Sequence, residues 1–565
     1  TAWMYSKELS RPAKRRSHER SGSRERSTGK KKKLARAFGK SLDEARRSRE
    51  RWFYGLAALT SIGVFVVFWF TNVFRDAILS NLELRNGTAA FQLWQRPPVG
   101  LTVKIYVFNY TNLAEFEGGN ASKLQVQEIG PYVYRETLSR VNVELHENET
   151  VTYQEKRSFK WISGKLENDR VVVPNVLLMS ALAFSRNLPY AMQLALTVLL
   201  SSFSVKPFLQ LSAGEYLWGY EDKFFQMIKP FAELNHHLPY DKFGLLAFIN
   251  GVSADRITMH TGVDSLRNLG LIDRVNGVKD RKIWGDEKCD RVYGTDGSIF
   301  PPHWVQQPNA TLHIYAKDVC RSMPFRYERR DFSYGIPTLR YLCVIRRHST
   351  SDCLHSISPL ASLGVVLPTC PPAGTFNISA CKFGAPLLLS FPHFYLGDES
   401  LFQRIDGLTP RREQHESYID LHPRLGVTVA THIKLQLNLE VRKAVGVPVA
   451  GNLEDGTILP LIWIDSGIEQ LPDSVQQIFY RAHYLANAIE AGCQWCSLVG
   501  VFLSIGGLIA AFRKQWRIDA KRNSDRDHDR IGLSPIPNLI PRETSINATD
   551  ITISTAPSTP VALKS

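Results

Sequence analysis

The 565-residue chain lacks the short motifs of the common enzyme classes. It contains no G-x-S-x-G elbow, H-E-x-x-H zinc motif, P-loop or G-x-G-x-x-G dinucleotide motif. His236 and His237 are adjacent, so they would point to different faces of a helix or strand, which does not favour a metal site. The sequence therefore predicts no catalytic activity, cofactor or metal. A glycosidase stays open as a minor alternative, since sequence cannot show two carboxylates facing each other.

Two long stretches lack Lys, Arg, His, Asp and Glu, and each has more than the roughly 20 residues that a helix needs to cross a bilayer. The flanks are basic: residues 1–51 carry 18 basic and 6 acidic side chains, whereas the middle of the chain carries 42 of each. Basic flanks stay on the cytoplasmic side. The sequence predicts a cytoplasmic N-terminal tail (1–51), a transmembrane helix (52–74), an extracellular domain (75–490), a second transmembrane helix (491–512) and a cytoplasmic C-terminal tail (513–565).

The N-terminal tail is rich in Lys and Arg close to the first predicted span. Each basic residue near an anionic membrane surface contributes about 1 kcal/mol of attraction. Anionic lipids of the inner leaflet are therefore the expected partner of this tail, and nucleic acid is not.

Glycosylation sequons and cysteines agree with this topology. Six cysteines fall in the predicted extracellular domain, where an oxidising environment favours disulfides, and none of the six is paired at the two-residue spacing typical of zinc ligands. The sequence predicts three disulfides among these six and N-glycans at the sequons between the spans. The cysteines are Cys289, Cys320, Cys343, Cys353, Cys370 and Cys381, and the sequons are Asn86, Asn109, Asn120, Asn148, Asn309 and Asn377.

A third uncharged run, residues 187–205, follows another apolar segment, residues 171–185. A third span would place the first four sequons and the cysteines on opposite sides of the membrane, so we interpret the two segments as consecutive apolar helices of the extracellular domain. Two alternatives stay open. The helices are either buried in the core or expose part of their apolar surface to lipid.

Period-two alternation with β-branched and aromatic residues predicts strands in the same domain, at residues 101–108, 132–143, 151–161 and 431–441. No linker or repeat divides residues 75–490, which predicts one β-rich domain with a helical cap.

Several short sequence segments occur together in one known family. The chain resembles the class B scavenger receptors, the family that includes fatty-acid translocase, the lysosomal integral membrane protein and the insect sensory-neuron membrane proteins. The resemblance rests on LRNGTAAFQLW (84–94), EIGPYVYRE (128–136), LWGYED (217–222), KCDRVYGTDGSIFPP (288–302), DVCRS (318–322), YGIPTLRY (334–341), GAPLLLSFPHFYLGD (384–398) and DGLTPRREQHESYIDLHPRLG (406–426).

The resemblance implies an α+β membrane protein in which two transmembrane helices flank an extracellular domain. That domain would have an antiparallel β-barrel core, an apical helical bundle and an internal apolar tunnel. The apex would capture lipids, fatty acids or lipoprotein particles, and the tunnel would pass fatty acids, sterols, carotenoids or similar molecules to the membrane. Leaving water is favourable for such cargo by about 0.8 kcal/mol per methylene, so a dry passage needs no catalytic group.

Residue by residue, the resemblance places the apical helices on residues 176–211. Arg186 and Lys206 become candidates for attracting anionic ligands, and Lys382 becomes a candidate partner for a carboxylate head group near the tunnel entrance. Each also fits an ordinary surface role. Leu194 and Leu199 are the expected apolar contacts with lipid.

The family's disulfide pattern implies pairs Cys289–Cys353 and Cys320–Cys381, leaving Cys343 to pair with Cys370. Where members of the family have a Cys-x-Cys motif, this chain has Cys353-Leu354-His355, so one family cysteine is replaced. Cys343 is an additional cysteine that the family pattern lacks. The six cysteines alone allow 15 connectivities.

The resulting hypothesis is a cell-surface lipid receptor and conduit, with homo-oligomers possible. An adhesion or sorting receptor without lipid transfer, and a trimeric two-span ligand-gated channel, are the alternatives. No tyrosine follows residue 512, and Leu539-Ile540 lacks an acidic residue four positions earlier, so the plasma membrane is favoured over endosome or lysosome.

Overall fold

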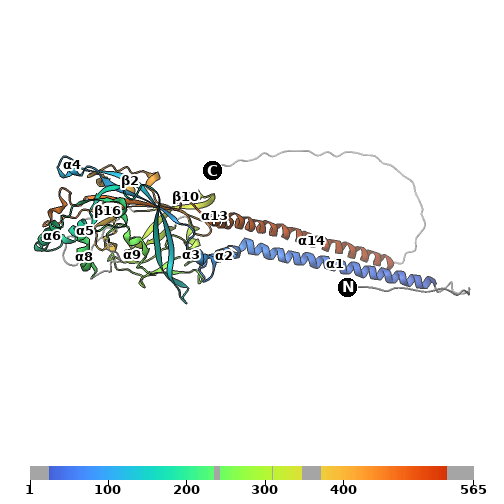
Figure 1. The fold of residues 1–565 in the computed structure, drawn as a ribbon. Coiled ribbons are helices and arrows are strands. Elements are labelled where there is room, and N and C mark those ends of the chain that lie inside the picture. Colours follow the sequence, from blue (N-terminus) through green and yellow to red (C-terminus); the bar gives the residue numbers. More distant parts are fainter. Residues whose placement is uncertain (1–23, 234–241, 308–309, 346–370, 531–565) are drawn as a thin grey trace, which may run out of the picture. The chain divides into compact units, whose positions relative to one another are not determined.

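The computed structural model describes residues 24–233, 242–307, 310–345 and 371–530 (Figure 1). These residues form two compact units. The larger unit runs from Phe65 to Trp495, and the smaller one combines the described residues up to Val64 with those from Cys496 onward.

The larger unit is a β domain with short helices. Its strands are β1 (Leu101–Tyr110), β2 (Leu124–Leu145), β3 (Thr150–Gly164), β4 (Arg170–Pro174), β5 (Phe208–Ser212), β6 (Gly251–Val252), β7 (Ile257–His260), β8 (Ile272–Val275), β9 (Thr311–Ala316), β10 (Arg321–Ser333), β11 (Ile336–Cys343), β12 (Thr375–Asn377), β13 (Leu387–Ser390), β14 (Ile405–Asp406), β15 (Tyr418–Leu421), β16 (Thr428–Glu440) and β17 (Ile458–Gly467).

Helices surround these strands. They are α2 (Val73–Leu79), α3 (Ala89–Gln95), α4 (Leu113–Glu117), α5 (Val176–Ser185), α6 (Tyr190–Ser202), α7 (Ala213–Trp218), α8 (Lys223–Glu233), α9 (Glu287–Asp290), α10 (Pro302–Val305), α12 (Arg412–His415) and α13 (Asp473–Tyr480). In Figure 1, α5, α6 and α8 gather at one end of the β domain, and α2, α3 and α13 lie at the other.

The main sheet is a nearly closed antiparallel barrel. Its strand order is β8-β7-β3-β2-β1-β17-β16-β15-β11-β10-β9. A short segment links the two edge strands: Ile272 of β8 donates to the Gly294 carbonyl (2.9 Å), and Thr295 donates to His313 of β9 (3.0 Å). Closing the sheet leaves few unpaired edges, which protects a large β domain from pairing with other chains.

All four predicted strands are confirmed, as β1, β2, β3 and β16. One detail of the helix prediction is wrong. Residues 171–174 belong to strand β4, which pairs with β5. Asn109 of β1 also accepts a hydrogen bond from the Val172 amide (2.7 Å) and ties this segment to the barrel.

The largest hydrophobic core joins the barrel to the helices at one end. It includes Ile105 of β1 and Leu461 of β17 together with Leu178 and Leu182 of α5, all fully buried. The helical end is therefore packed on the barrel rather than attached by flexible loops.

Strand β16 buries its polar face. Lys434, Gln436 and Asn438 are buried, whereas the alternating Leu435 and Leu437 are only partly buried. Gln436 donates to Asn438 (2.7 Å). The alternation predicted a strand correctly, but the side that faces inward is the polar one.

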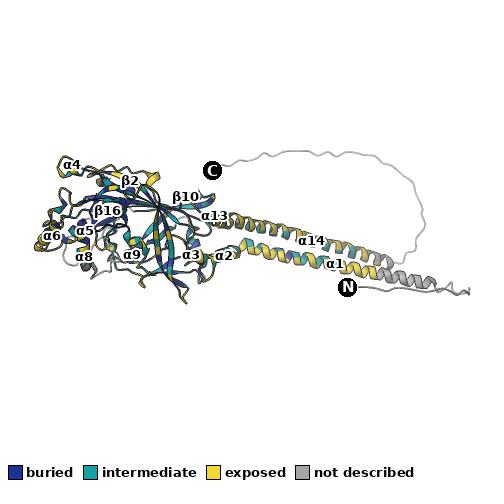
Figure 2. Cartoon of the chain, viewed as in Figure 1, coloured by how far each residue is buried: buried dark blue, intermediate teal, exposed yellow. Residues whose placement is uncertain are grey.

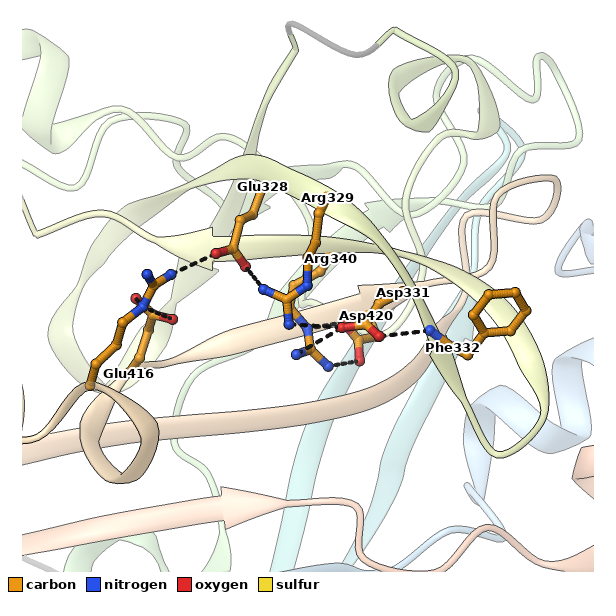
Figure 3. Close-up of polar contacts among 8 residues, drawn as sticks. Glu328, Arg329, Asp331, Phe332, Arg340, Glu416 and Asp420 are labelled. Atoms are coloured by element: carbon orange, nitrogen blue, oxygen red, sulfur yellow. Dashed lines mark hydrogen bonds and ion pairs between the residues drawn. The ribbon is translucent and has the colours of Figure 1, made fainter.

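A ladder of ion pairs crosses β10, β11 and β15 (Figure 3). Arg340 binds Asp420 through Nε (2.8 Å) and Nη2 (2.7 Å), and Asp331 also contacts Arg340 (2.9 Å). The ladder continues outward through Arg329 and Glu328. Asp420 is completely buried, so its charge depends on Arg340 for compensation.

The smaller unit contains most of two long helices, α1 (Arg24–Phe70) and α14 (Ala486–Arg530). Each belongs to a helical segment long and apolar enough to cross a membrane. They run antiparallel in register: a Cβ added at Gly500 would lie 2.9 Å from Ser61, and one at Gly507 would lie 2.5 Å from Tyr54. Glycines permit this close approach, as is common between transmembrane helices. The first expected span is helical only to Phe70, and α2 begins at Val73.

We predict that Arg340→Ala lowers the free energy of unfolding by about 3–5 kcal/mol, because it leaves the buried Asp420 carboxylate uncompensated. Thermal unfolding of the full chain in detergent, followed by tryptophan fluorescence, measures this. The matched control is Arg412→Ala, which removes an exposed arginine from the outer end of the same ladder and should have little effect. Equal midpoints for the two variants would contradict the assigned role of Arg340.

Candidate functional site

The two apolar helices of the barrel's helical end have different environments. Asn175 is the N-cap residue of α5, and its side chain accepts a hydrogen bond from the Leu178 amide (3.1 Å). Most of α5 is buried, including Met179 and Leu182. In α6 only Gln193 and Leu200 are buried. Of the two alternatives left open by sequence, burial holds for α5 and exposure for α6.

α6 has an exposed face (Figure 2), and the helix carries no charged residue. Leu194 is 50% exposed and Val198 is 66% exposed. The face is extended by Phe184, Tyr190, Met192 and Phe203, all exposed. We call these six residues the apical face. Covering these six side chains would release on the order of 5 kcal/mol, before the cost of association.

A loop from the other half of the chain holds α6 in place. The Gly446 amide donates to Gln193 Oε1 (2.8 Å), and Thr197 Oγ1 donates to the Gly446 carbonyl (2.8 Å). A Cβ at Gly446 would meet Gln193 at 2.8 Å, so only glycine allows this contact. The same loop exposes Val445 by 95%, which adds one more apolar side chain beside α6.

The two candidate cations of this region differ. Arg186 forms an ion pair with Asp455 (3.2 Å), so its charge is already partly compensated. Lys206 is exposed and has no ion pair among the described residues. Lys206 is therefore the better placed of the two to attract an anionic ligand.

Lys382 lies apart from the apical face, beside the Cys320–Cys381 disulfide. Its ammonium is 3.8 Å from the centroid of the Phe248 ring, a cation–π contact. Burial lowers the pKa of Lys382 to about 8, with the Asp318 carboxylate opposing this shift and the Lys317 ammonium adding to it. Lys382 is thus a partly desolvated cation next to aromatic surface, not an ordinary surface lysine.

A further cluster carries groups that could act chemically, namely Glu128, His393, His415 and Trp463. Glu128 accepts hydrogen bonds from Trp463 Nε1 (2.8 Å) and lies 2.5 Å from His393 Nε2. Burial alone raises the pKa of Glu128, but these two hydrogen bonds lower it on balance. Burial lowers the pKa of His415 to about 4, so this ring is neutral at pH 7. The cluster is internally satisfied, and among the described residues no group of three or more His, Cys, Asp or Glu could hold a metal ion.

The asparagines of the six predicted glycosylation sequons differ in exposure to solvent. Asn86, Asn120 and Asn148 are exposed. Asn109 is half-buried with its carbonyl oxygen engaged by Val172, and Asn309 lies outside the described residues. Asn377 is 8% exposed and accepts a hydrogen bond from the Ser379 amide, which argues against the glycan expected there.

The structure contains the disulfide Cys320–Cys381 that the resemblance implies. Cys353 and Cys370 lie outside the described residues, so the Cys289–Cys353 pair stays an expectation. Cys343, at the end of β11, has no disulfide partner among the described residues, and burial raises the pKa of its thiol to about 12. Cys370 lies outside those residues, so the expected pairing of Cys343 with Cys370 stays a prediction.

The two leucines expected to contact lipid differ in exposure, and their role in binding stays a prediction. Leu199 is partly buried and packs against the main core, whereas its neighbour Val198 is exposed. Phe184, Tyr190 and Met192 were missed. α6 has no charged residue, and its polar Gln193 and Thr197 face the loop at Gly446 instead of solvent. The usual rule that the polar face of a helix points outward therefore does not identify the exposed residues.

The comparisons with known proteins agree with this architecture. The family model described as the CD36 family matches residues 53–511. Scavenger receptor class B member 1 of Bos taurus is 32% identical over 485 residues, covering 84% of this chain and 91% of the relative. Lysosome membrane protein 2 of Homo sapiens is 28% identical over 418 residues, covering 73% of this chain and 84% of the relative.

We predict that oleate binding by the full chain in detergent weakens as the pH rises from 7 to 9. The pKa of Lys382, about 8 instead of 10.5, means that its charge is lost in this range. Lys382→Gln should bind oleate about tenfold more weakly at pH 7, the value of one charge-assisted contact, and should lose the pH dependence. The control is Lys165→Gln at an exposed lysine. An unchanged pH profile in Lys382→Gln would rule out this role.

Proposed function

The chain belongs to the CD36 family, and from that membership we propose that it is a cell-surface receptor that captures lipid or lipoprotein ligands on its apical face. Receptors of this family are non-enzymatic, and the family generally binds lipids or lipoproteins. Family membership accounts for the two-span topology, so the alternative of a ligand-gated channel is not needed to explain it.

The observation that carries the proposal is the exposed apolar surface of α6. A helix without any ionisable residue that keeps Leu194 and Val198 in water is unfavourable unless something covers it. A lipid surface suits this face because it offers apolar contacts over a broad area and requires no matching polar groups. Lys206 nearby adds attraction for anionic lipid.

We propose further that captured hydrophobic molecules, such as fatty acids, sterols or carotenoids, pass through the extracellular domain to the membrane. Lys382, with its aromatic neighbour Phe248, is the proposed contact for a carboxylate head group on this route. The chemistry supports passage without reaction, because moving an apolar chain between two dry environments breaks no bond.

A plasma-membrane location fits these proposals, with both tails cytoplasmic. The two relatives described above carry names that point to different places, one a scavenger receptor and the other a lysosome membrane protein. A sorting or adhesion receptor that binds at the apex without transfer remains the second candidate, since the same surface would serve it.

We predict that Leu194→Asp and Val198→Asp each reduce capture of phosphatidylcholine vesicles by expressing cells about tenfold. Each change removes an apolar contact and forces desolvation of a carboxylate on binding. Vesicles carrying a fluorescent fatty acid measure capture, and surface labelling of an epitope tag corrects for display.

Leu145→Asp is the matched control, because Leu145 is also an exposed leucine but lies at the β2–β3 turn. Loss of capture in Leu145→Asp, or full capture in both α6 variants at normal display, would contradict the proposal. Fatty acid that stays on captured vesicles and never enters the cell membrane would support the receptor without transfer.

A further inference from the structure

A groove with a volume of about 550 Å³ lies between α1 and α14 in the smaller unit. One end is lined by Ser48, Arg51 and Trp52. Phe512 of α14 is level with this end, because Lys514 contacts Glu50 and Gly507 lies against Tyr54. The remainder is lined by Gly55 and by the apolar side chains of Leu56, Leu59 and Leu508. The lining thus changes from cationic and polar to apolar along the helix axis, which is the polarity profile of a lipid.

The guanidinium of Arg51, at the polar end of the groove, is available to bind a ligand. Arg51 forms no ion pair or hydrogen bond with any described residue. The carboxylates nearby serve other cations: Glu50 contacts Arg46 (3.7 Å) and Lys514 (3.9 Å). A guanidinium on the wall of an apolar groove can bind phosphate or carboxylate oxygens through two parallel hydrogen bonds.

The dimensions match one membrane leaflet. From Arg51 to Gly63, the middle of the first predicted span, the helix rises about 18 Å at 1.5 Å per residue. Half of a bilayer's hydrocarbon core is about 15 Å. When Gly63 lies near the middle of the bilayer, Arg51 therefore lies near head-group level.

We propose that this groove binds one anionic phospholipid of the cytoplasmic leaflet, with its head group on Arg51 and Ser48 and an acyl chain that runs from Phe512 along Leu508, Leu56 and Leu59. Basic pockets between transmembrane helices on the cytoplasmic side are a recurrent form of lipid recognition. Phosphatidylcholine fits less well, because its head group is neutral overall, whereas phosphatidylserine has an additional carboxylate and a net negative charge to offer Arg51. The choice of leaflet rests on the proposed topology, and the site is independent of ligand capture at the apex.

Native mass spectrometry of the full chain in detergent, titrated with phosphatidylserine or phosphatidylcholine, tests whether binding depends on the charge of the lipid head group. We expect phosphatidylserine to bind about fivefold more tightly, the value of one basic residue near an anionic surface. Arg51→Gln should abolish this preference. The control Arg49→Gln, at an exposed arginine outside the groove, should keep it. Equal binding of the two lipids by the unmodified chain, or equal behaviour of the two variants, would overturn the proposal.

A second pair of variants tests the groove itself. A Cβ added at Gly55 meets nothing within 4 Å, so Gly55→Leu should fill the groove without disturbing the helices and should abolish phosphatidylserine adducts. Gly63 is equally open but outside the groove, and Gly63→Leu should retain the adducts. Retention in Gly55→Leu, or equal loss in Gly63→Leu, would show that binding does not depend on this groove.

The apical variant Leu194→Asp separates this site from the proposed function. It should lose vesicle capture and keep its phosphatidylserine adduct. Failure of the groove would therefore leave the apical proposal intact, and failure of apical capture would leave the groove intact.

Discussion

The burial of α5 against the β-barrel is the interaction on which the apical end depends. Leu178 and Leu182 enter the same core as Ile105 and Leu461 of the barrel, so α5 cannot move without opening that core. α6 follows after a short turn and is clamped by Gln193 and Thr197 to the loop at Gly446. With its polar groups satisfied in this way, α6 can hold an apolar face in water without collapsing onto the barrel.

Charged side chains likewise fall into two groups, those paired within the fold and those left to bind a ligand. Asp420 and Arg340 form a buried pair that stabilises the outer strands, and Arg186 is engaged by Asp455 at the helical end. Two cations that form no ion pair with a described residue are more informative. Lys206 near the apical face and Arg51 in the groove between the long helices both lie beside apolar surface, where an anionic amphiphile would satisfy charge and hydrophobic contacts together.

Much of this architecture could be predicted from sequence. Uncharged length identified both apolar helices, and alternation identified β1, β2, β3 and β16, because these signals depend only on local residues. Which face of β16 is buried could not be predicted, since Gln436 and Asn438 are satisfied by contacts within the fold. The cation–π partner of Lys382, the groove beside Arg51 and the exposure of Val198 instead of Leu199 likewise depend on residues distant in sequence.

The central claim is that α6 meets lipid directly. Hydrogen–deuterium exchange of the full chain, with and without phosphatidylcholine vesicles, tests it most directly. The account predicts slower amide exchange over residues 184–203 when vesicles are present, with little change at the β2–β3 turn around Leu145. Unchanged exchange over residues 184–203 under conditions where vesicles are bound would contradict it.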